Sequence, residues 1–548
     1  MNKVALIFLF TCSQIIFSAT KITQTEKFAA TCKIWGFLKY YHPKVAAGEV
    51  NWDAALLEKL PKIEKAQTTE EFSVIIENWI DDLGVIKEIA PIAAPKEIQF
   101  FDDNFNLSWL NDKMFSKKLS KKLKFIEENR FQTEEEFGPD FDGFKKTKSY
   151  YDLDYNLKYS RILMAFSYWN VVEYYFPYKY LMDQKWDKTL EQSLPFIFDA
   201  KGPAEFLTVM TRMAARLNDS HVVFHIYPEP TTFKTPFYFP ATGKIIEEKL
   251  VVTEIFADSL AEAENIRIGD VITKINDKAI KDYIEENRNL KSASNEVSFL
   301  NKVVKPILTS YNENVKVEFL KDRSYETKKM VWFNYHDSHR NEFKKGAKKK
   351  KNKFELLDNN IGYVNMGVIK PKNIPDMIEA FKTTKAIVFD LRNYPQNTWK
   401  EISDFLNPQE KKFCEYTMPY LKYPGRYVWT EGRKCGFENK NNYKGKVIVL
   451  LNEDSMSQSE WTAMCFQTAG RTTIVGSQTA GADGNVFEFD FKLFHTGFSG
   501  IGVYYPDKSE TQRIGIVPDI EIKPTIKGIQ EGRDEVLERA LAFIETGK

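Results

Sequence analysis

Several features that would indicate metal, redox or lipid chemistry are scarce in this sequence of 548 residues. Its five cysteines and six histidines form neither a CxxC nor an HExxH pattern, so neither a metal nor another cofactor is expected. The formal net charge is +1, and this balance favours neither nucleic acid nor an anionic membrane as a partner. The absence of a GxSxG block argues against a cytosolic esterase. No segment beyond the N-terminus reaches the roughly 18 to 20 apolar residues that span a bilayer.

The N-terminus has the composition of an export signal. Lys3 is followed by an apolar run over residues 4–10, and small residues end the segment at Ser18 and Ala19. Residues 1–19 are therefore predicted to be a signal peptide, which places the protein in the periplasm, in the cell envelope or outside the cell. Two alternatives stay open, namely a buried N-terminal element and a lipoprotein whose modified residue is Cys12.

Four cysteines remain after removal of that segment, and two of them bracket an irregular insertion of 20 residues. These two, Cys414 and Cys435, are candidates for a disulfide in an oxidising compartment, although the sequence does not establish the pairing.

Length and composition predict several domains. A chain of this length exceeds a single hydrophobic core, and its content of 43% hydrophobic and 14% aromatic residues is enough to fill several cores. The segments expected from the changes in pattern are two helical modules at 21–94 and 158–235, a connector at 95–157, a β-rich domain at 236–334, a basic linker at 335–354 and an α/β domain at 355–548.

The two helical modules carry the same spacing of aromatic residues and prolines. Nine positions separate Pro43 from Trp52, and nine separate Pro177 from Trp186. Such matched spacing predicts an internal duplication, and it makes the aromatic residues core rather than ligand-binding. His42 corresponds to Phe176 in the second module and is therefore interpreted as structural.

The second module differs from the first at its end, where Ser220 and His221 precede a strand-like run. Histidine is the usual general base near neutral pH, so His221 is a candidate base. A surface or capping histidine is the alternative.

Two lysine-rich runs are interpreted as solvated rather than as binding patches. The first covers residues 117–122 and is expected to be an exposed helix face. The second, at 344–351, is expected to be a solvated connector because no aromatic platform for nucleic acid accompanies it. No nucleic-acid partner is predicted.

Short alternating strands dominate residues 236–334. Within them, Ala257–Ala261 and the block Gly269–Asp270–Val271–Ile272 stand in the order and spacing of a PDZ module, which this segment resembles. PDZ modules capture chain ends by β-augmentation, so the resemblance implies a polypeptide partner.

The last segment alternates strands and helices. Apolar runs at 361–366, 386–392, 446–451 and 473–476 predict a buried sheet of parallel type, and residues 374–381 predict a helix.

Residues 452–460 join one of these strands to a helix and contain three serines, Ser455, Ser457 and Ser459. Backbone N–H groups at the start of a helix are unpaired and can hold a developing oxyanion, so this turn is suited to a nucleophile. A helix N-cap is the alternative interpretation.

Four short blocks in this order resemble the C-terminal-processing (tail-specific) serine peptidases. They cover residues 390–395, 455–460, 476–481 and 515–520. The resemblance implies a crotonase-like (ClpP-like) α/β peptidase domain within a multidomain α+β protein, acting on polypeptide substrates.

One pattern of that family uses a lysine base, but Ala482 occupies the corresponding position. The other pattern, that of the tricorn-core branch, uses a Ser–His pair upstream of the PDZ module, which matches Ser220 and His221. The resemblance implies Ser457 as the nucleophile, His221 as the base and Ser220 held by Gln512, which stands where the branch has a glutamate. The implied oxyanion donors are the backbone amides of Gln458 and of the turn at Gln396.

Two hypotheses follow for the function. The first is an exported serine endopeptidase that acts on extended or unfolded polypeptides. The second is a non-catalytic peptide-binding or scaffold protein that retains the peptidase fold. The oligomeric state is not determined by the sequence.

Overall fold

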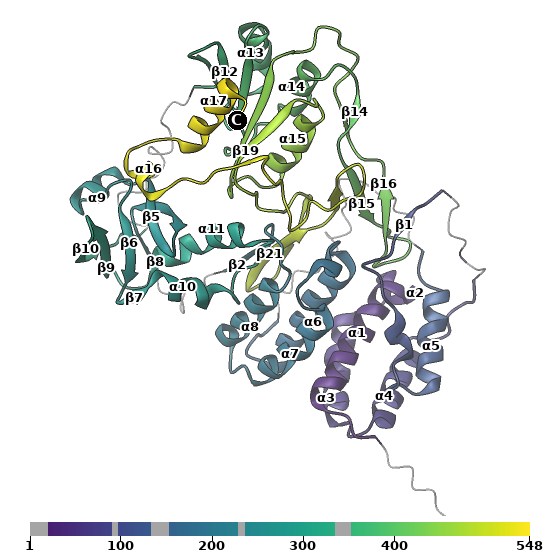
Figure 1. Cartoon of the computed structure of the whole chain (residues 1–548). Helices are drawn as coiled ribbons and strands as arrows, with labels where there is room; N and C mark the ends of the chain where they lie inside the picture. Colours follow the sequence, from purple (N-terminus) through teal and green to yellow (C-terminus); the bar gives the residue numbers. More distant parts are fainter. Residues whose placement is uncertain (1–19, 90–91, 93–96, 133–152, 228–235, 335–351) are drawn as a thin grey trace, which may run out of the picture. The chain divides into compact units, whose positions relative to one another are not determined.

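The computed structural model describes residues 20–89, 92, 97–132, 153–227, 236–334 and 352–548. The chain divides into two compact units, one formed by Met1–Ala93 with Asn106–Gln132 and the other by Ala94–Phe105 with Thr133–Lys548 (Figure 1). In the described parts, no helix is both long enough and apolar enough to cross a membrane. The predicted signal peptide and the second lysine run lie outside the described residues.

The first unit is helical. Its first helix begins at a capping box, in which the Glu26 amide donates to the Thr23 hydroxyl and the Thr23 amide donates to the Glu26 carboxylate. Pro43 follows the end of this helix and starts the next one. The elements are α1 (Gln24–Tyr41), α2 (Pro43–Ala46), α3 (Trp52–Lys65), α4 (Thr69–Asp82), η1 (Ser108–Asn111) and α5 (Lys117–Glu128).

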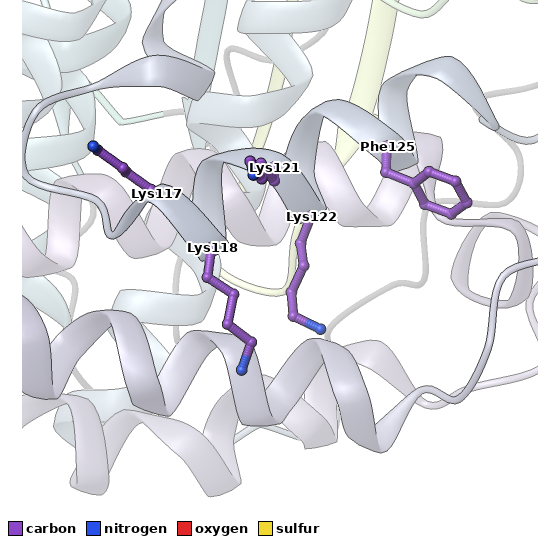
Figure 2. Close-up of a pocket in the computed structure, with 5 residues that line it drawn as sticks. All are labelled: Lys117, Lys118, Lys121, Lys122 and Phe125. Carbon is purple, nitrogen blue, oxygen red and sulfur yellow. The ribbon is translucent and has the colours of Figure 1, made fainter.

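The lysine run expected to be a solvated face lies on α5. The opposite side of the helix buries Leu119, Leu123 and Ile126. Lys118 forms an ion pair with Glu77 at 3.0 Å. A shallow hollow of about 610 Å³ is lined by five side chains of this one helix, and Figure 2 shows that they project from it in different directions; they are Lys117, Lys118, Lys121, Lys122 and Phe125.

The second unit contains three helices of 18, 14 and 13 residues, which are close in length to the 18, 14 and 14 residues of α1, α3 and α4. They are α6 (Lys158–Tyr175), α7 (Trp186–Asp199) and α8 (Pro203–Ala215), with the short η3 (Lys179–Leu181) after α6. In each set two indole groups donate reciprocally to backbone carbonyls. Trp35 and Trp52 do so at 3.3 and 3.0 Å, and Trp169 and Trp186 at 3.2 and 2.9 Å. The tryptophans are therefore structural in both sets.

His42 lies at the C-terminal end of α1 and is buried. Neither ring nitrogen has a hydrogen-bond partner among the described residues. Burial, and to a lesser extent Lys44, lowers the pKa of His42 to about 4, so the ring is neutral at neutral pH.

The β-rich domain is built around an antiparallel sheet with the order β10-β9-β6-β5-β4, and β7 pairs with β6. Its apolar side chains form one core that includes Leu250, Ile272, Val303 and Phe319. The strands are β3 (Phe237–Tyr238), β4 (Ala241–Ile246), β5 (Lys249–Ile255), β6 (Val271–Ile275), β7 (Lys278–Ala279), β8 (Thr309–Ser310), β9 (Asn314–Lys321) and β10 (Ser324–Val331). The helices are α9 (Asp258–Ala263), α10 (Ile280–Asn287) and α11 (Glu296–Ile307).

The α/β domain has a central sheet with the order β11-β12-β13-β18-β19-β23, which is parallel except for β11. The predicted parallel core is thus confirmed. The strands are β11 (Phe354–Leu357), β12 (Ile361–Asn365), β13 (Ala386–Asp390), β18 (Lys446–Leu451), β19 (Thr472–Gly476) and β23 (Ile520–Glu521).

Side chains of the central sheet alternate between two cores. Phe389 and Val449 belong to a core shared with the helices α13, α14 and α15, whereas Val388 and Ile448 belong to a core shared with α17. These helices are labelled around the sheet in Figure 1. The helical elements are η4 (Pro371–Asn373), α13 (Ile374–Phe381), α14 (Trp399–Leu406), α15 (Gln458–Gln467), α16 (Ile526–Gln530) and α17 (Glu535–Thr546).

In the described residues, four smaller sheets complete this unit, with the orders β1-β16-β15-β22, β2-β21-β20, β14-β17 and β3-β8. The segment between Cys414 and Cys435, expected to be irregular, contains regular strands, and both cysteines are free. The predicted bridge between them is therefore absent. The strands are β1 (Phe100–Phe101), β2 (Val223–Ile226), β14 (Lys411–Lys412), β15 (Glu415–Pro419), β16 (Tyr427–Thr430), β17 (Lys434–Cys435), β20 (Val486–Asp490), β21 (Phe494–Ser499) and β22 (Gly502–Tyr504).

Candidate active site

Ser457 lies in the sharp turn between β18 and α15, and its backbone is strained. Its φ is 56° and its ψ is −121°, in a region that residues with a side chain rarely adopt. Strain of this kind costs on the order of 1–3 kcal/mol and persists only where the surrounding structure enforces it. A strained turn from a strand to a helix is also how α/β hydrolases expose a nucleophilic serine.

The three serines of this turn have different surroundings. Ser455 is buried, and its hydroxyl donates to the carbonyl of Leu391 at 3.0 Å. Ser459 is also buried, and its hydroxyl has no partner in the described structure. Ser457 is half-buried, and its side chain makes no cap hydrogen bond to the helix that it precedes. Of the three, the geometry thus favours Ser457 as the group that reaches a substrate.

Glu460 holds Ser457 against the turn at residues 479–482. The Ser457 amide donates to the Ala482 carbonyl at 2.8 Å and to Glu460 at 3.1 Å. The same carboxylate accepts from the amides of Gly481 and Ala482 at 2.7 and 3.0 Å, and from the Thr479 hydroxyl. Burial raises the pKa of Glu460 to about 7, against the effect of these donors. The turn that would carry a lysine base in the other family pattern is therefore a support for the nucleophile.

Ser220 binds the other side of this turn. Its hydroxyl contacts the Ala480 carbonyl and the Ser298 hydroxyl, both at 2.7 Å, while the Ala480 amide donates to the Ser455 carbonyl at 3.0 Å. The Ser220–His221 segment and the Ser457 turn are thus joined through residues 480–482. Residues of the β-rich domain take part in this junction, because the Ser220 amide donates to the Ser294 hydroxyl at 2.8 Å.

The predicted contact between Ser220 and Gln512 is wrong. The Gln512 side-chain amide instead donates to the Asp219 carboxylate at 3.1 Å. The expectation failed because it placed the orienting contact on the hydroxyl of Ser220, whereas that hydroxyl is occupied by the Ala480 carbonyl and by Ser298.

His221 is oriented by a chain of two hydrogen bonds. Its Nδ1 lies 2.9 Å from the Ser499 hydroxyl, which donates to the Asp219 carboxylate at 3.1 Å. Because the Ser499 hydroxyl donates its proton to the hydrogen bond with Asp219, its oxygen accepts a hydrogen bond from the Nδ1–H group of the imidazole. The proton of the neutral ring is then on Nδ1, and Nε2 keeps its lone pair and has no partner among the described residues. This is the tautomer that a general base requires.

Asp219 is fully buried and is the centre of the network around the base. In addition to Ser499 Oγ and Gln512, it accepts from the backbone amides of His221 and Ser499 at 3.0 and 2.8 Å. Burial lowers the pKa of His221, the Asp219 charge raises it, and the nearby Lys302 lowers it. The ring is therefore neutral at neutral pH and ready to accept a proton.

The sequence interpretation did not include Asp219 or Ser499. Asp219 immediately precedes the Ser220–His221 pair, and this acidic residue next to a candidate base was a usable signal. Ser499 is 278 residues from His221 at the end of β21, and no motif or spacing pointed to it.

The two predicted oxyanion donors lie on turns that contact one another. The Gln458 side chain donates to the Asn397 side chain at 3.4 Å, which brings the start of α15 to the turn at Gln396. The backbone amides of Gln458 and Gln396 donate to no other described residue, so both remain available to an incoming carbonyl oxygen. Asn397 has a φ of 56°, as befits a tight turn.

Ser457 and His221 are not hydrogen-bonded to one another in this structure. Such contacts often tighten only when substrate is bound. Among the described residues, no group of three or more histidine, cysteine or acidic side chains is arranged to hold a metal ion. The site therefore offers a hydroxyl, a neutral imidazole and unpaired amides, which are the groups required for acyl transfer.

Comparison with known proteins gives a family match for the α/β domain that carries Ser457. Residues 360–522 match the description "Peptidase family S41". A protein of Chlamydia pneumoniae is 27% identical over 99 residues, and this match covers 17% of the chain and 16% of the relative. The chain therefore corresponds to only a small part of that relative's length.

The fold is similar to that of CPAF, and a second solved structure shows a weaker likeness. Mature CPAF, solved in complex with lactacystin, has a TM-score of 0.54 at 12% identity, and the match covers 70% of this chain and 98% of CPAF. The photosystem II D1 C-terminal processing protease has a TM-score of 0.39 at 17% identity, covering 69% of this chain and 98% of that one. At these identities the likeness to CPAF concerns the fold.

Proposed function

Because residues 360–522 form a peptidase family S41 domain, we propose that this chain is a serine endopeptidase that cleaves extended or unfolded polypeptides. The observation that carries the proposal is the hydrogen-bond chain from Asp219 through Ser499 to His221, which prepares Nε2 as a base beside the strained Ser457 turn.

In the proposed reaction, Ser457 Oγ attacks the carbonyl carbon of a peptide bond while its proton passes to Nε2 of His221. The carbonyl oxygen becomes an oxyanion and is held by the amides of Gln458 and Gln396. The imidazolium then protonates the leaving amine, which leaves an acyl-enzyme. Water hydrolyses this ester with His221 again acting as the base, and Ser457 regains its proton.

The buried charge of Asp219 stabilises the imidazolium that forms in each half-reaction. Gln512 has no charge of its own, and its role is to fix Asp219 by donating a hydrogen bond. This division of roles explains how the site functions with a glutamine where the tricorn-core branch has a glutamate.

The β-rich domain is proposed to be a PDZ-like module that presents polypeptide to the site. The resemblance rests on residues 269–272, and the last two of these begin β6. We also infer that the helices α6–α8 duplicate the set α1, α3 and α4, since both sets contain the reciprocal tryptophan pair. Export is proposed from the sequence of residues 1–19 alone.

A non-catalytic polypeptide-binding protein is the second candidate. Two observations favour it: Ser457 and His221 are not hydrogen-bonded to one another, and the turn at Gln396 and Asn397 lacks the glycines usual for the family that the sequence resembles. Such a protein would retain the fold and the substrate surface without turnover.

Labelling with a fluorophosphonate probe distinguishes the two candidates. The wild-type protein is expected to be labelled, whereas Ser457→Ala is expected not to be labelled and His221→Ala to be labelled far more slowly. Ser459→Ala is the matched control, because this serine lies in the same turn but is buried. An unlabelled wild type, or equal labelling of Ser457→Ala, would disprove the peptidase proposal.

A further inference from the structure

Two cysteines of the α/β domain meet in the core beside the nucleophile helix. Cys435 ends the short strand β17 and Cys465 lies on α15, the helix that begins directly after Ser457. Cys435 Sγ lies 3.7 Å from the carbonyl oxygen of Cys465, and each of the two thiols shifts the pKa of the other. Both residues are buried, at 3% and 0% exposure. Because they are 30 residues apart on different elements, only the tertiary fold brings the thiols together.

We propose that Cys435 and Cys465 are a disulfide-forming pair, which a small disulfide oxidant converts to a bond that links α15 to β17. This proposal is independent of the peptidase reaction. It also differs from the candidate bridge considered from the sequence, which joins Cys435 to Cys414.

The surroundings of the two thiols determine which one reacts first. Cys435 Sγ lies 3.3 Å from the Thr468 hydroxyl and accepts from the side-chain amide of Asn407 at 3.8 Å. Hydrogen bonds from Cys465 and Thr468 lower the pKa of the Cys435 thiol, whereas burial raises that of Cys465. The thiolate is the reactive form, so Cys435 is the attacking group.

The exchange is balanced with oxidised glutathione as the oxidant. The Cys435 thiolate attacks one sulfur of glutathione disulfide, and a mixed disulfide forms as one glutathione thiolate leaves. Cys465 then loses its proton, attacks Cys435 Sγ and releases the second glutathione thiolate. In total the protein loses two protons and two electrons, and one disulfide oxidant becomes two glutathione thiols. Local opening of the two-stranded β14-β17 sheet gives the oxidant access.

Cys414 has other contacts. Its sulfur accepts from the Arg433 amide at 3.4 Å, and Tyr416 and Trp461 are its side-chain partners. The strand pairing places Lys411 opposite Cys435. Cys414 therefore serves as an internal control, as a buried thiol of the same domain whose hydrogen-bond partners are other residues than Cys435.

The test is a disulfide map of the full chain after incubation with glutathione disulfide. Free thiols are blocked with an alkylating reagent, and the non-reduced digest is analysed by mass spectrometry. The expected result is one cross-linked peptide pair containing Cys435 and Cys465, an intact protein lighter by two hydrogens, and reversal by a dithiol reductant. The link should persist in Cys414→Ser and disappear in Cys435→Ser.

The oxidised wild type is also expected to melt at a higher temperature than the reduced form, because the bond closes a loop that contains the Ser457 turn. A Cys414–Cys435 link, a glutathione adduct without the internal bond, or no loss of free thiols would each overturn the proposal. Since the map is made on the wild-type chain, a variant that fails to fold does not affect the decision.

Discussion

Replacement of Asp219 by Asn tests how the site stabilises its base. The carboxylate is fully buried and lies within about 6 Å of Nδ1 of the imidazole, because hydrogen bonds of 2.9 and 3.1 Å connect the two groups through the Ser499 hydroxyl. At an effective dielectric constant of about 20, a unit charge at that distance stabilises an imidazolium by about 3 kcal/mol, so kcat/KM is expected to fall by about 100-fold. A direct Asp–His contact would predict a larger loss.

The acid limb of the pH profile separates this role from a purely structural one. Burial lowers the pKa of His221 and the Asp219 charge opposes that shift. Without the charge the pKa falls further, so the midpoint of the acid limb in kcat/KM should move to lower pH in Asp219→Asn. The assay is hydrolysis of an unfolded, fluorescently labelled polypeptide across a range of pH.

A double-mutant cycle supplies the refutation. If Asp219 acts through the imidazole, Asp219→Asn should cost almost nothing further in a His221→Ala background. Asp490→Asn, at an exposed carboxylate that ends β20, is the control and should leave activity nearly unchanged. Activity of Asp219→Asn within about threefold of wild type, or losses that add fully in the double variant, would show that the buried charge does not support the base.

Three further predictions concern stability and positioning. Ser457→Gly should raise the free energy of unfolding by about 1 kcal/mol relative to Ser457→Ala, because glycine adopts a φ of 56° without strain; equal denaturant midpoints would contradict the strain at this turn. The pKa of His42 is about 4 in the folded protein, below the ordinary value of 6.5. The stabilisation from the neutral, buried imidazole is therefore complete above pH 6.5 and is lost as the pH falls toward 4. This loss lowers the free energy of unfolding by at most about 3 kcal/mol. His42→Phe introduces the residue type found at the corresponding position Phe176 and should remove this acid sensitivity. Hydrogen exchange in α1, measured as a function of pH, is the assay, and an unchanged pH dependence in the variant would refute the role of His42. Ser298→Ala removes a hydrogen bond of 2.7 Å to Ser220 and should lower the free energy of unfolding by about 1 kcal/mol. The variant should also lower kcat more than it raises KM, and an effect on KM alone would contradict a role of Ser298 in positioning the base.

Local patterns in the sequence determined most of the secondary structure that carries the site. The strand at 446–451 and the helix at 374–381 were predicted with their observed bounds, because apolar runs and helical periodicity are properties of neighbouring residues. The same holds for the turn at residues 452–460, where a buried strand is followed by small hydroxyl residues and a helix. The pairing of Ser457 with His221 came from the family resemblance, and the structure joins their segments through one turn.

Only the tertiary structure decided which side chains meet at that turn. The role expected for Gln512 was assigned to the wrong partner, since it bonds to Asp219, 293 residues away in the sequence. Ser499 and the contact of the Cys435 thiol with Cys465 likewise had no signal in spacing or composition. Contacts of this kind depend on how separate sheets and helices pack against one another. A change of one side-chain rotamer or a shift of one strand register would exchange the contacting residues, although the local sequence pattern of each element would stay the same. The sequence therefore determined the elements and the candidate nucleophile and base, and the packing decided the charge, the tautomer and the strain that prepare them for the reaction.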